Sequence, residues 1–209
     1  METKMAEQAQ SYPVFKVFDK WDISQIKVND VGLVSVINLK PKLVIKSHGR
    51  NVAKMGQLKV NIIERLMNKL AVSGHRGKKH KIQKGKITGK YTTLMNIILS
   101  AFDMIEKKTG KNPVEVFVRA IENAAPRDEI TVIEYGGAKY PQAVDVAPLR
   151  RVNLAIKHIL HGSGDKAFGK KKDIATAIAE EIMLAADNNG ESFAVKKKKE
   201  CEAQADSAR

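Results

Sequence analysis

The sequence predicts a mainly α-helical protein, a bundle of about six helices with a projecting two-stranded β-ribbon. Apolar residues recur at helical spacing over most of residues 61–187. At about residues 129–147 the spacing changes to two, which is typical of strands. Apolar residues make up 43% of the 209 residues, so the chain can bury a sizeable core. We expect a partly irregular N-terminal extension at 1–56 and a helical domain at 57–209.

The first predicted helix follows an extension in which the β-branched runs VGLVSVINL and KLVIK alternate with turn residues. These runs predict one or two strands before residue 56. From Asn61, the segment NIIERLMNKLAV places its apolar residues on one side of a helix. Asn61 and Glu64 stand three residues apart, as in a capping box that binds the free amides of a helix start.

The next two helices have clear ends. One is expected over residues 90–109, and Gly110 suits the left-handed position that follows a helix. The other begins with Asn112 as its cap and Pro113 in the first helical position, and Pro126 ends it.

The predicted ribbon consists of EITVIEY and AVDVA, which are joined by GGAKYPQ. This spacing predicts a hairpin with a long tip that projects from the helices. Pro148 opens a fourth helix, and a fifth is expected near 172–187. The last segment, AVKKKKECEAQADSAR, has almost no apolar stripe, so it should be poorly ordered unless a partner holds it.

The formal net charge of +14 favours a polyanionic partner, either nucleic acid or an anionic membrane surface. Residues 57–110 hold twelve basic and three acidic residues, so the excess is concentrated there. No apolar run approaches the roughly 18–20 residues that span a bilayer, and the N-terminus lacks the apolar segment of a signal peptide. Cys201 is the only cysteine, which fits a reducing compartment. We therefore expect a cytoplasmic protein without membrane contact.

Most of the excess lies in GHRGKKHKIQKGKITGK, residues 74–90, where seven of 17 residues are Lys or Arg. A solvated surface loop is the simple alternative, but charges this dense repel one another unless phosphates neutralise them. The glycines allow the backbone to approach a surface closely. GKITGKY does not have the glycine spacing of a nucleotide-type phosphate loop, and Tyr91 stands where Ser or Thr would hold Mg²⁺. We therefore predict a loop that binds a polyanion.

Further basic groups lie at Arg150–Arg151, Lys170–Lys172 and Lys196–Lys199. The lysine runs have a simple alternative as solubilising surface, but separated patches suit a long folded polyanion. An aromatic content of 5% argues against stacking platforms for single strands, so structured RNA is expected. His158 and His161 stand at i and i+3 without further metal ligands, so neither a metal nor a cofactor is expected. No nucleophile–base pair stands out, and we expect no enzyme.

Several long motifs carry a family resemblance. They are VNIIERLMNKL, ITGKYTTLMNIILSAFDMIEKKTGKNPVEVFVRAIENAAPRDE, the hairpin with QAVDVAPLRRVNLAI, and AVKKKK with SAR near the end. Over roughly residues 57–209 they closely resemble the universal small-subunit ribosomal protein family numbered seven in bacteria and five in eukaryotes. FDKWDISQIKVND is similar to the extension of archaeal and eukaryotic members, and RAIENAAPRDE and YGGAKY are similar to archaeal members.

The resemblance implies a structural constituent of the small ribosomal subunit, with ribosomal RNA and neighbouring head and platform proteins as partners and no small-molecule substrate. It implies direct binding to the 3′ major domain of the RNA, nucleation of head assembly, and a place at the subunit interface near the decoding centre. By this resemblance the residues expected to bind ribosomal RNA are Arg76, Lys78, Lys79, Lys81, Lys90, Arg150 and Arg151. Lys139 and Tyr140 would lie at the ribbon tip, near exit-site tRNA and mRNA.

The sequence also departs from the family. The basic loop is longer than the family's short loop, so Lys84 and Lys86 are expected to bind RNA on their charge alone. Lys170, Lys171 and Lys172 lie outside this loop, and they too are expected to bind RNA on their charge. The ribbon carries the acidic residues Glu129 and Glu134 and only one basic residue, Lys139, so we expect it to act mainly by shape. The alternative function is that of a free architectural or regulatory RNA-binding protein.

Overall fold

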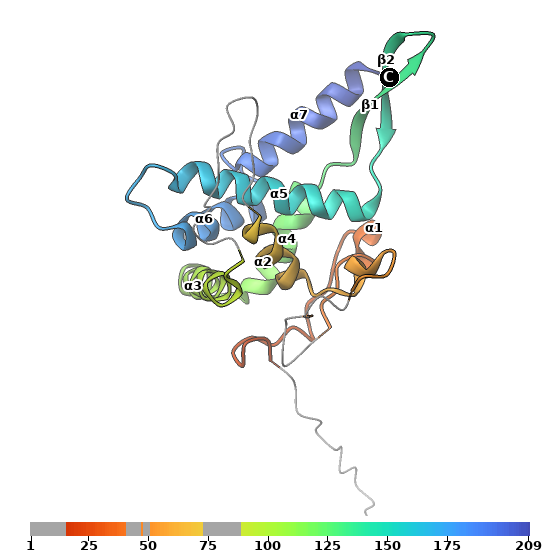
Figure 1. Cartoon of the computed structure of the whole chain (residues 1–209). Helices are drawn as coiled ribbons and strands as arrows, with labels where there is room; N and C mark the ends of the chain where they lie inside the picture. The colour runs from red at the N-terminus through yellow and green to blue at the C-terminus, as the bar shows by residue number, and fades with distance from the viewer. Residues whose placement is uncertain (1–15, 41–46, 48–50, 73–88) are drawn as a thin grey trace, which may run out of the picture.

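The computed structural model describes residues 16–40, 47, 51–72 and 89–209. The described residues form seven α-helices, one short 3₁₀ helix and one two-stranded antiparallel sheet. In chain order the elements are α1 (Val31–Val34), η1 (Gly56–Lys59), α2 (Ile62–Ala71), α3 (Tyr91–Thr109), α4 (Pro113–Ala124), β1 (Asp128–Tyr135), β2 (Ala138–Asp145), α5 (Pro148–Ala167), α6 (Ile174–Ala186) and α7 (Phe193–Ser207). The helices form the body of the molecule, and the hairpin of β1 and β2 projects from it (Figure 1). The predicted fold class is confirmed.

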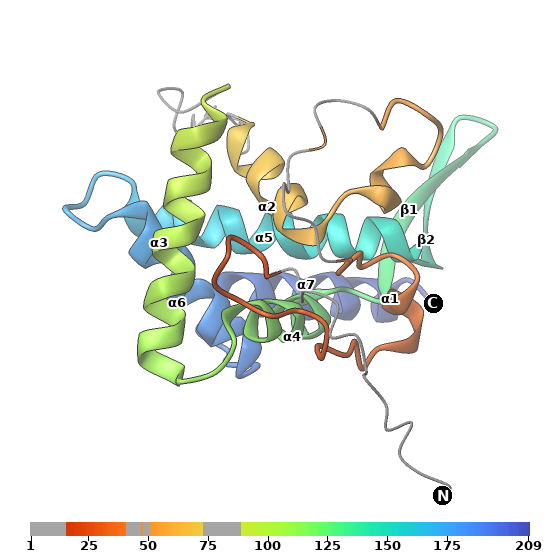
Figure 2. The ribbon, with the colours of Figure 1, turned by 90° about the horizontal axis from the view of Figure 1, so that it is seen from below.

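Helix α6 is the hub of the bundle and packs against α3, α4 and α5. Its buried face alternates Ile174, Ile178 and Ile182 with alanines, whose small side chains allow neighbouring helices to approach closely. Figure 2 shows α3 running across the direction of α5 and α6. None of the helices in the described ranges is both long enough and apolar enough to cross a membrane.

The described part of the N-terminal extension joins the same core as the helices. The ring of Trp21 packs edge-on against Phe102 at a centroid distance of 5.7 Å, and Phe102 lies 6.1 Å from Phe117. The indole Nε1 of Trp21 donates a hydrogen bond of 3.0 Å to Glu106. Leu33 of α1 is fully buried in this cluster. The extension is therefore held by apolar contacts together with polar contacts such as this part-buried indole bond.

The strand predicted from VGLVSVINL is wrong. Its first four residues form α1, because the Asp30 side chain accepts a hydrogen bond of 2.9 Å from the Gly32 amide and caps a helical turn. Residues 41–46, which contain the whole of the second predicted run, lie outside the described residues. Within the described extension, extended pairing is limited to a single bridge between Val17 and Trp21.

The predicted helix starts are confirmed, with one change. The Asn61 side chain accepts from the Ile63 amide at 2.9 Å, and the Asn112 side chain accepts from the Val114 amide at 3.0 Å. Glu64 does not complete the expected capping box. Its carboxylate accepts instead from the amide and the hydroxyl of Ser47, at 2.8 and 2.7 Å. Glu64 therefore ties the extension to α2.

The long hairpin tip predicted from GGAKYPQ is also wrong. Tyr135 pairs directly with Ala138, so the turn contains only Gly136 and Gly137. Both have positive φ, +57° and +80°, which is the requirement of the tight turn that suits the twist of a hairpin. Counting hydrogen-bonded and non-bonded pairs alternately from this turn places Pro141 in a non-bonded pair, where its missing N–H removes no ladder bond.

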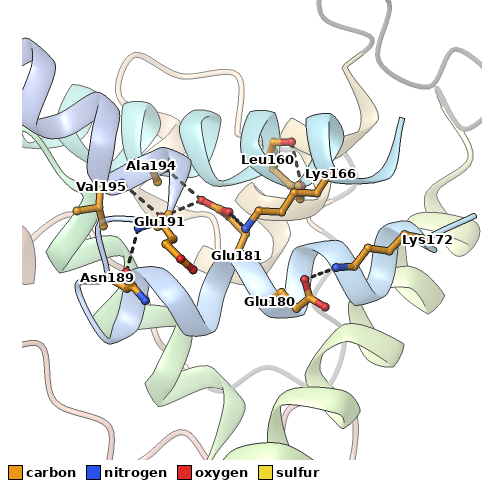
Figure 3. Close-up of polar contacts among 11 residues, drawn as sticks. Leu160, Lys166, Lys172, Glu180, Glu181, Asn189, Glu191, Ala194 and Val195 are labelled. Atoms are coloured by element: carbon orange, nitrogen blue, oxygen red, sulfur yellow. Dashed lines mark hydrogen bonds and ion pairs between the residues drawn. The ribbon is translucent and has the colours of Figure 1, made fainter. Parts of the chain in front are cut away.

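The C-terminal segment is an ordered helix, contrary to the prediction from its sparse apolar residues. The Ser192 side chain caps α7, and its hydroxyl donates a hydrogen bond of 2.8 Å to Glu181 of α6 (Figure 3). Further along, Glu202 accepts from the Arg127 amide, and Arg209 pairs with Asp128 at 2.6 Å. These polar contacts anchor the start of α7 on α6 and its end at the base of the ribbon.

Candidate nucleic-acid interface

The basic loop connects α2 to α3. Six residues predicted to bind RNA there lie outside the described residues: Arg76, Lys78, Lys79, Lys81, Lys84 and Lys86. The seventh, Lys90, is exposed and occupies the N-cap position of α3, after Gly89 with φ of +77°. The first turn of α3 holds no acidic residue, and its cap makes no side-chain bond to the amides. This end of α3 is therefore positive through both Lys90 and the helix dipole.

Arg150 joins helix α5 to the ribbon. Its Nε and Nη2 donate to the two carboxylate oxygens of Glu129 at 2.6 and 2.8 Å, a two-pronged ion pair. This hydrogen bonding holds the pKa of Glu129 below its ordinary value and raises the pKa of Arg150. The Arg150 side chain remains 58% exposed, so one side of the guanidinium still faces solvent beside the ribbon base.

Arg151, the next residue, points into the protein. Its side chain is 10% exposed, its Nε donates to the carbonyl of Pro126 at 3.1 Å, and its Nη2 pairs with Asp30 at 2.8 Å. Burial opposes ionisation of Asp30, but the bonds from Arg151 and the Gly32 amide prevail and lower the pKa of Asp30. The geometry therefore supports a structural role for Arg151, and contact with RNA remains a prediction.

The two neighbouring arginines should differ sharply when substituted. We expect Arg151→Leu to lower the free energy of unfolding by about 2 kcal/mol, because the Pro126 carbonyl and Asp30 lose their donor. Arg150→Ala removes a largely exposed pair and should change it by less than about 1 kcal/mol. Urea unfolding monitored by circular dichroism measures both. Equal losses would contradict the internal role of Arg151.

The lysines after α5 lie at its far end from the arginines. Lys170 and Lys171 are exposed, whereas Lys172 pairs with Glu180 of α6. Helix α5 spans Pro148–Ala167, so about 30 Å of helix separates its two ends. The structure therefore brings Arg150 to the ribbon base and leaves the lysine group on a distant edge. A single ligand that touches both must be long.

The ribbon tip is apolar and nearly free of basic groups. Lys139 faces Glu134 across the strands, and Tyr140 faces Ile133. Tyr135, Tyr140 and Ile133 share one face of the hairpin, and they are 82%, 59% and 47% exposed. The tip thus exposes rings and aliphatic surface, and action of the ribbon by shape remains a prediction.

The remaining predicted features have structural partners. The rings of His158 and His161 lie 6.4 Å apart in an edge-to-face arrangement, and His158 also lies 6.3 Å from Phe193. Among the described residues, no group of three or more potential metal-ligating side chains gathers. In the lysine run of α7, Lys198 donates to the Asn123 carbonyl at 3.1 Å, and burial lowers its pKa.

Arg65 is a functional candidate that the sequence reasoning did not single out. It lies on α2, is 4% exposed, and its guanidinium contacts Asn153 of α5 at 3.0 Å. The periodicity of α2 contained the signal, because a residue three positions after buried Ile62 falls on the inward side of the helix. A charged residue at an inward position marks either an ion pair or a ligand site.

Comparison with known proteins shows which family the chain belongs to. The family profile described as ribosomal protein S7p/S5e matches residues 37–209. The chain is 50% identical over 195 residues to the small ribosomal subunit protein uS7 of Nanoarchaeum equitans, covering 93% of this chain and 98% of that protein. The chain belongs to the ribosomal protein S7p/S5e family.

Other relatives in this family are archaeal as well. Small ribosomal subunit protein uS7 of Archaeoglobus fulgidus is 44% identical over 194 residues, which is 92% of this chain and 94% of that protein. The uS7 of Thermoplasma volcanium is 42% identical over 92% of this chain and all of that protein. As a member of the S7p/S5e family, the chain is a non-enzymatic structural constituent of the small ribosomal subunit.

Proposed function

We propose that the chain binds the 3′ major domain of small-subunit ribosomal RNA directly and nucleates assembly of the subunit head. It then lies at the subunit interface near the decoding centre, among neighbouring head and platform proteins in the cytoplasmic ribosome. The observation that carries the proposal is the family match over residues 37–209, together with a net charge of +9 in residues 57–110. Structured RNA is the polyanion that a small-subunit ribosomal protein meets.

The layout of the charged groups supports one long ligand. Lys90 lies exposed at the start of α3, Arg150 lies at the ribbon base, and Lys170 and Lys171 lie beyond the other end of α5. Contacts with phosphates fix the position of a protein on RNA, and shape supplies most of the specificity for folded RNA. The ribbon, with its exposed Tyr140, would rest against exit-site tRNA and mRNA by shape and apolar contact.

A filter-binding assay with three RNA transcripts tests the proposal. We expect the chain to bind the 3′ major domain at least about 1,000-fold more tightly than the 5′ or central domain, as specific sites exceed non-specific ones. The logarithm of the binding constant should fall linearly with the logarithm of salt concentration, with a slope of about −0.7 to −0.9 per neutralised phosphate. Equal binding to all three transcripts would contradict the proposal.

Sedimentation separates the proposal from the alternative of a free regulatory RNA-binding protein. Most of the protein in a cell extract should travel with the small subunit. If most of it stays at the top of the gradient while the small subunit is intact, the alternative is favoured.

A further inference from the structure

A cavity lies between η1, α2 and α5, apart from the groups predicted to bind RNA. Its volume is about 320 Å³, near the lower end of the roughly 300–1,000 Å³ that small-molecule sites occupy. The lining combines two cations, three amides and two aliphatic side chains: Arg65, Lys69, Gln57, Asn68, Asn153, Val60 and Ile156. Among the residues that the structure describes, no carboxylate lines this cavity.

Arg65 is the strongest sign that the cavity takes a ligand. Its Nη1 donates to the Val36 carbonyl and its Nη2 to Asn153, both at 3.0 Å, while its buried Nε has no hydrogen-bond partner within the described ranges. Burial alone lowers the pKa of Arg65 to about 10, so the group is still charged at neutral pH. No acidic residue in the described part of the chain forms an ion pair with it. A buried guanidinium without a counter-charge is unfavourable unless an anion compensates it.

The amides around Arg65 form a connected, oriented set. Asn153 accepts from both Arg65 and Gln57, and it donates to the Gln57 side chain at 3.2 Å. Asn68 and Lys69 follow Arg65 by three and four residues, so all three lie on one face of α2. Asn68 and Lys69 are exposed, which leaves their polar ends available at the mouth of the cavity.

We propose that this cavity receives one unpaired nucleotide of the bound RNA, with its phosphate against Arg65 and Lys69 and its base edge against the amides. This inference rests on the proposed function and adds a site that reads a base. Unpaired nucleotides are where proteins read RNA sequence, because their edges are free for hydrogen bonds. Val60 and Ile156 supply apolar wall for a base, which a free inorganic phosphate would leave unused.

Two substitutions at the mouth test the phosphate and base contacts separately. Lys69→Ala should weaken binding to the 3′ major domain about 3- to 10-fold and reduce the salt slope by about 0.7–0.9. Asn68→Ala should weaken binding while leaving the salt slope unchanged. Lys108→Ala, an exposed lysine near the end of α3, is the matched control and should bind like the unaltered chain. If Lys69→Ala also behaves like this control, the cavity does not hold a phosphate.

A cleavage experiment identifies the nucleotide. Cys201 is the only cysteine, so Val72→Cys in a Cys201→Ser background can carry a tethered iron chelate that cleaves nearby RNA. Val72 is 57% exposed and lies one helical turn beyond Asn68, so the tether leaves the cavity itself unchanged. Cleavage should centre on one unpaired nucleotide. Cleavage confined to continuous duplex would overturn the inference.

Removing that base completes the test. An RNA with an abasic residue at this nucleotide should bind the unaltered chain about 10-fold more weakly, as for a lost base contact. It should lose nothing further with Asn68→Ala, because the two changes remove the same contact. Unchanged binding of the abasic RNA would overturn base reading. If the abasic RNA binds unchanged while the chain still prefers the 3′ major domain in a salt-dependent way, only the proposed nucleotide site is rejected. If the chain shows no preference for the 3′ major domain, the proposed function and the nucleotide site are rejected together.

Discussion

Replacing Glu181 with leucine is expected to lower the free energy of unfolding by about 3 kcal/mol. Glu181 is fully buried, and its carboxylate accepts hydrogen bonds from Lys166 at 2.6 Å, the Ser192 hydroxyl at 2.8 Å and the Ala194 amide at 3.2 Å (Figure 3). Lys166 is 30% exposed and can turn to water, but the hydroxyl and the amide would stay buried without an acceptor. Each such donor costs about 1–3 kcal/mol.

Glu180 supplies a matched control one residue away. It pairs with Lys172 near the surface, so Glu180→Ala should change the free energy of unfolding by less than about 1 kcal/mol. Glu181→Gln keeps an oxygen for Ser192 and Ala194, and it should lose less than Glu181→Leu. Thermal unfolding measures all three variants, at about 2–4 °C per kcal/mol for a chain of this size. Similar losses for Glu180→Ala and Glu181→Leu would show that burial of this carboxylate is unimportant.

The same substitution should loosen the C-terminal helix before it unfolds the bundle. Glu181 holds the first turn of α7, and the other end of α7 contacts the ribbon base through Glu202 and Arg209. Amide hydrogen exchange in α7 should therefore accelerate more in Glu181→Leu than exchange in α4. Equal acceleration in both helices would contradict a local role.

Replacing Arg76, Lys78, Lys79 and Lys81 together with alanine is expected to weaken binding to the 3′ major domain by about 100-fold or more at 0.1 M salt. The salt slope should become less steep by about 3, since four phosphate contacts are lost at roughly 0.7–0.9 each. The physical cause is the lost release of counterions from the RNA, so the effect should shrink as the salt concentration rises. Filter binding over a series of salt concentrations measures both quantities.

A second quadruple variant distinguishes the loop from net charge. Lys16, Lys107, Lys108 and Lys111 are exposed and lie away from the basic loop in sequence, so replacing them with alanine removes the same charge elsewhere. This variant should retain most of the affinity and most of the slope. If the two quadruple variants lose binding equally, the overall charge of the chain explains the interaction and the loop has no special part in it. Circular dichroism should show that both variants remain folded.

The helices could be predicted from local signals because those signals act within a few residues. Asn112 with Pro113 marks the start of α4, and Gly110 with φ of +65° follows α3 where the sequence placed it. The ribbon was predicted as a hairpin at the right position in the chain. The length of its turn was predicted wrongly, because KYPQ contains a proline and was assigned to the turn instead of to β2. The pairing of the two strands sets the turn. Gly136 and Gly137 close the hairpin, and Pro141 lies at a position where its missing N–H removes no hydrogen bond between the strands.

The residues of the candidate site also fall into those that the sequence predicts and those that only the structure reveals. Charge density in a continuous stretch is visible in a sequence, and it pointed to the loop at 74–90 and to Arg150. Burial of a single side chain is not visible, so Arg151 resembled its neighbour although it binds Pro126 and Asp30 inside the protein. The periodicity of α2 places Arg65 on the inward side of the helix, but the cavity depends on a contact with Asn153, 88 positions away, which no local pattern predicts.

By itself, the sequence determined that this chain is a basic helical bundle with a projecting ribbon, and its motifs were sufficient to identify a small-subunit ribosomal protein. These properties follow from periodicity, caps and charge, which depend on near neighbours. Only the tertiary structure decided that the C-terminal segment is an ordered helix. Its few apolar residues do not predict this order, but Glu181, Glu202 and Arg209 make contacts across the fold that stabilise the helix. Such contacts join residues distant in the chain, so they exist only once the bundle has formed.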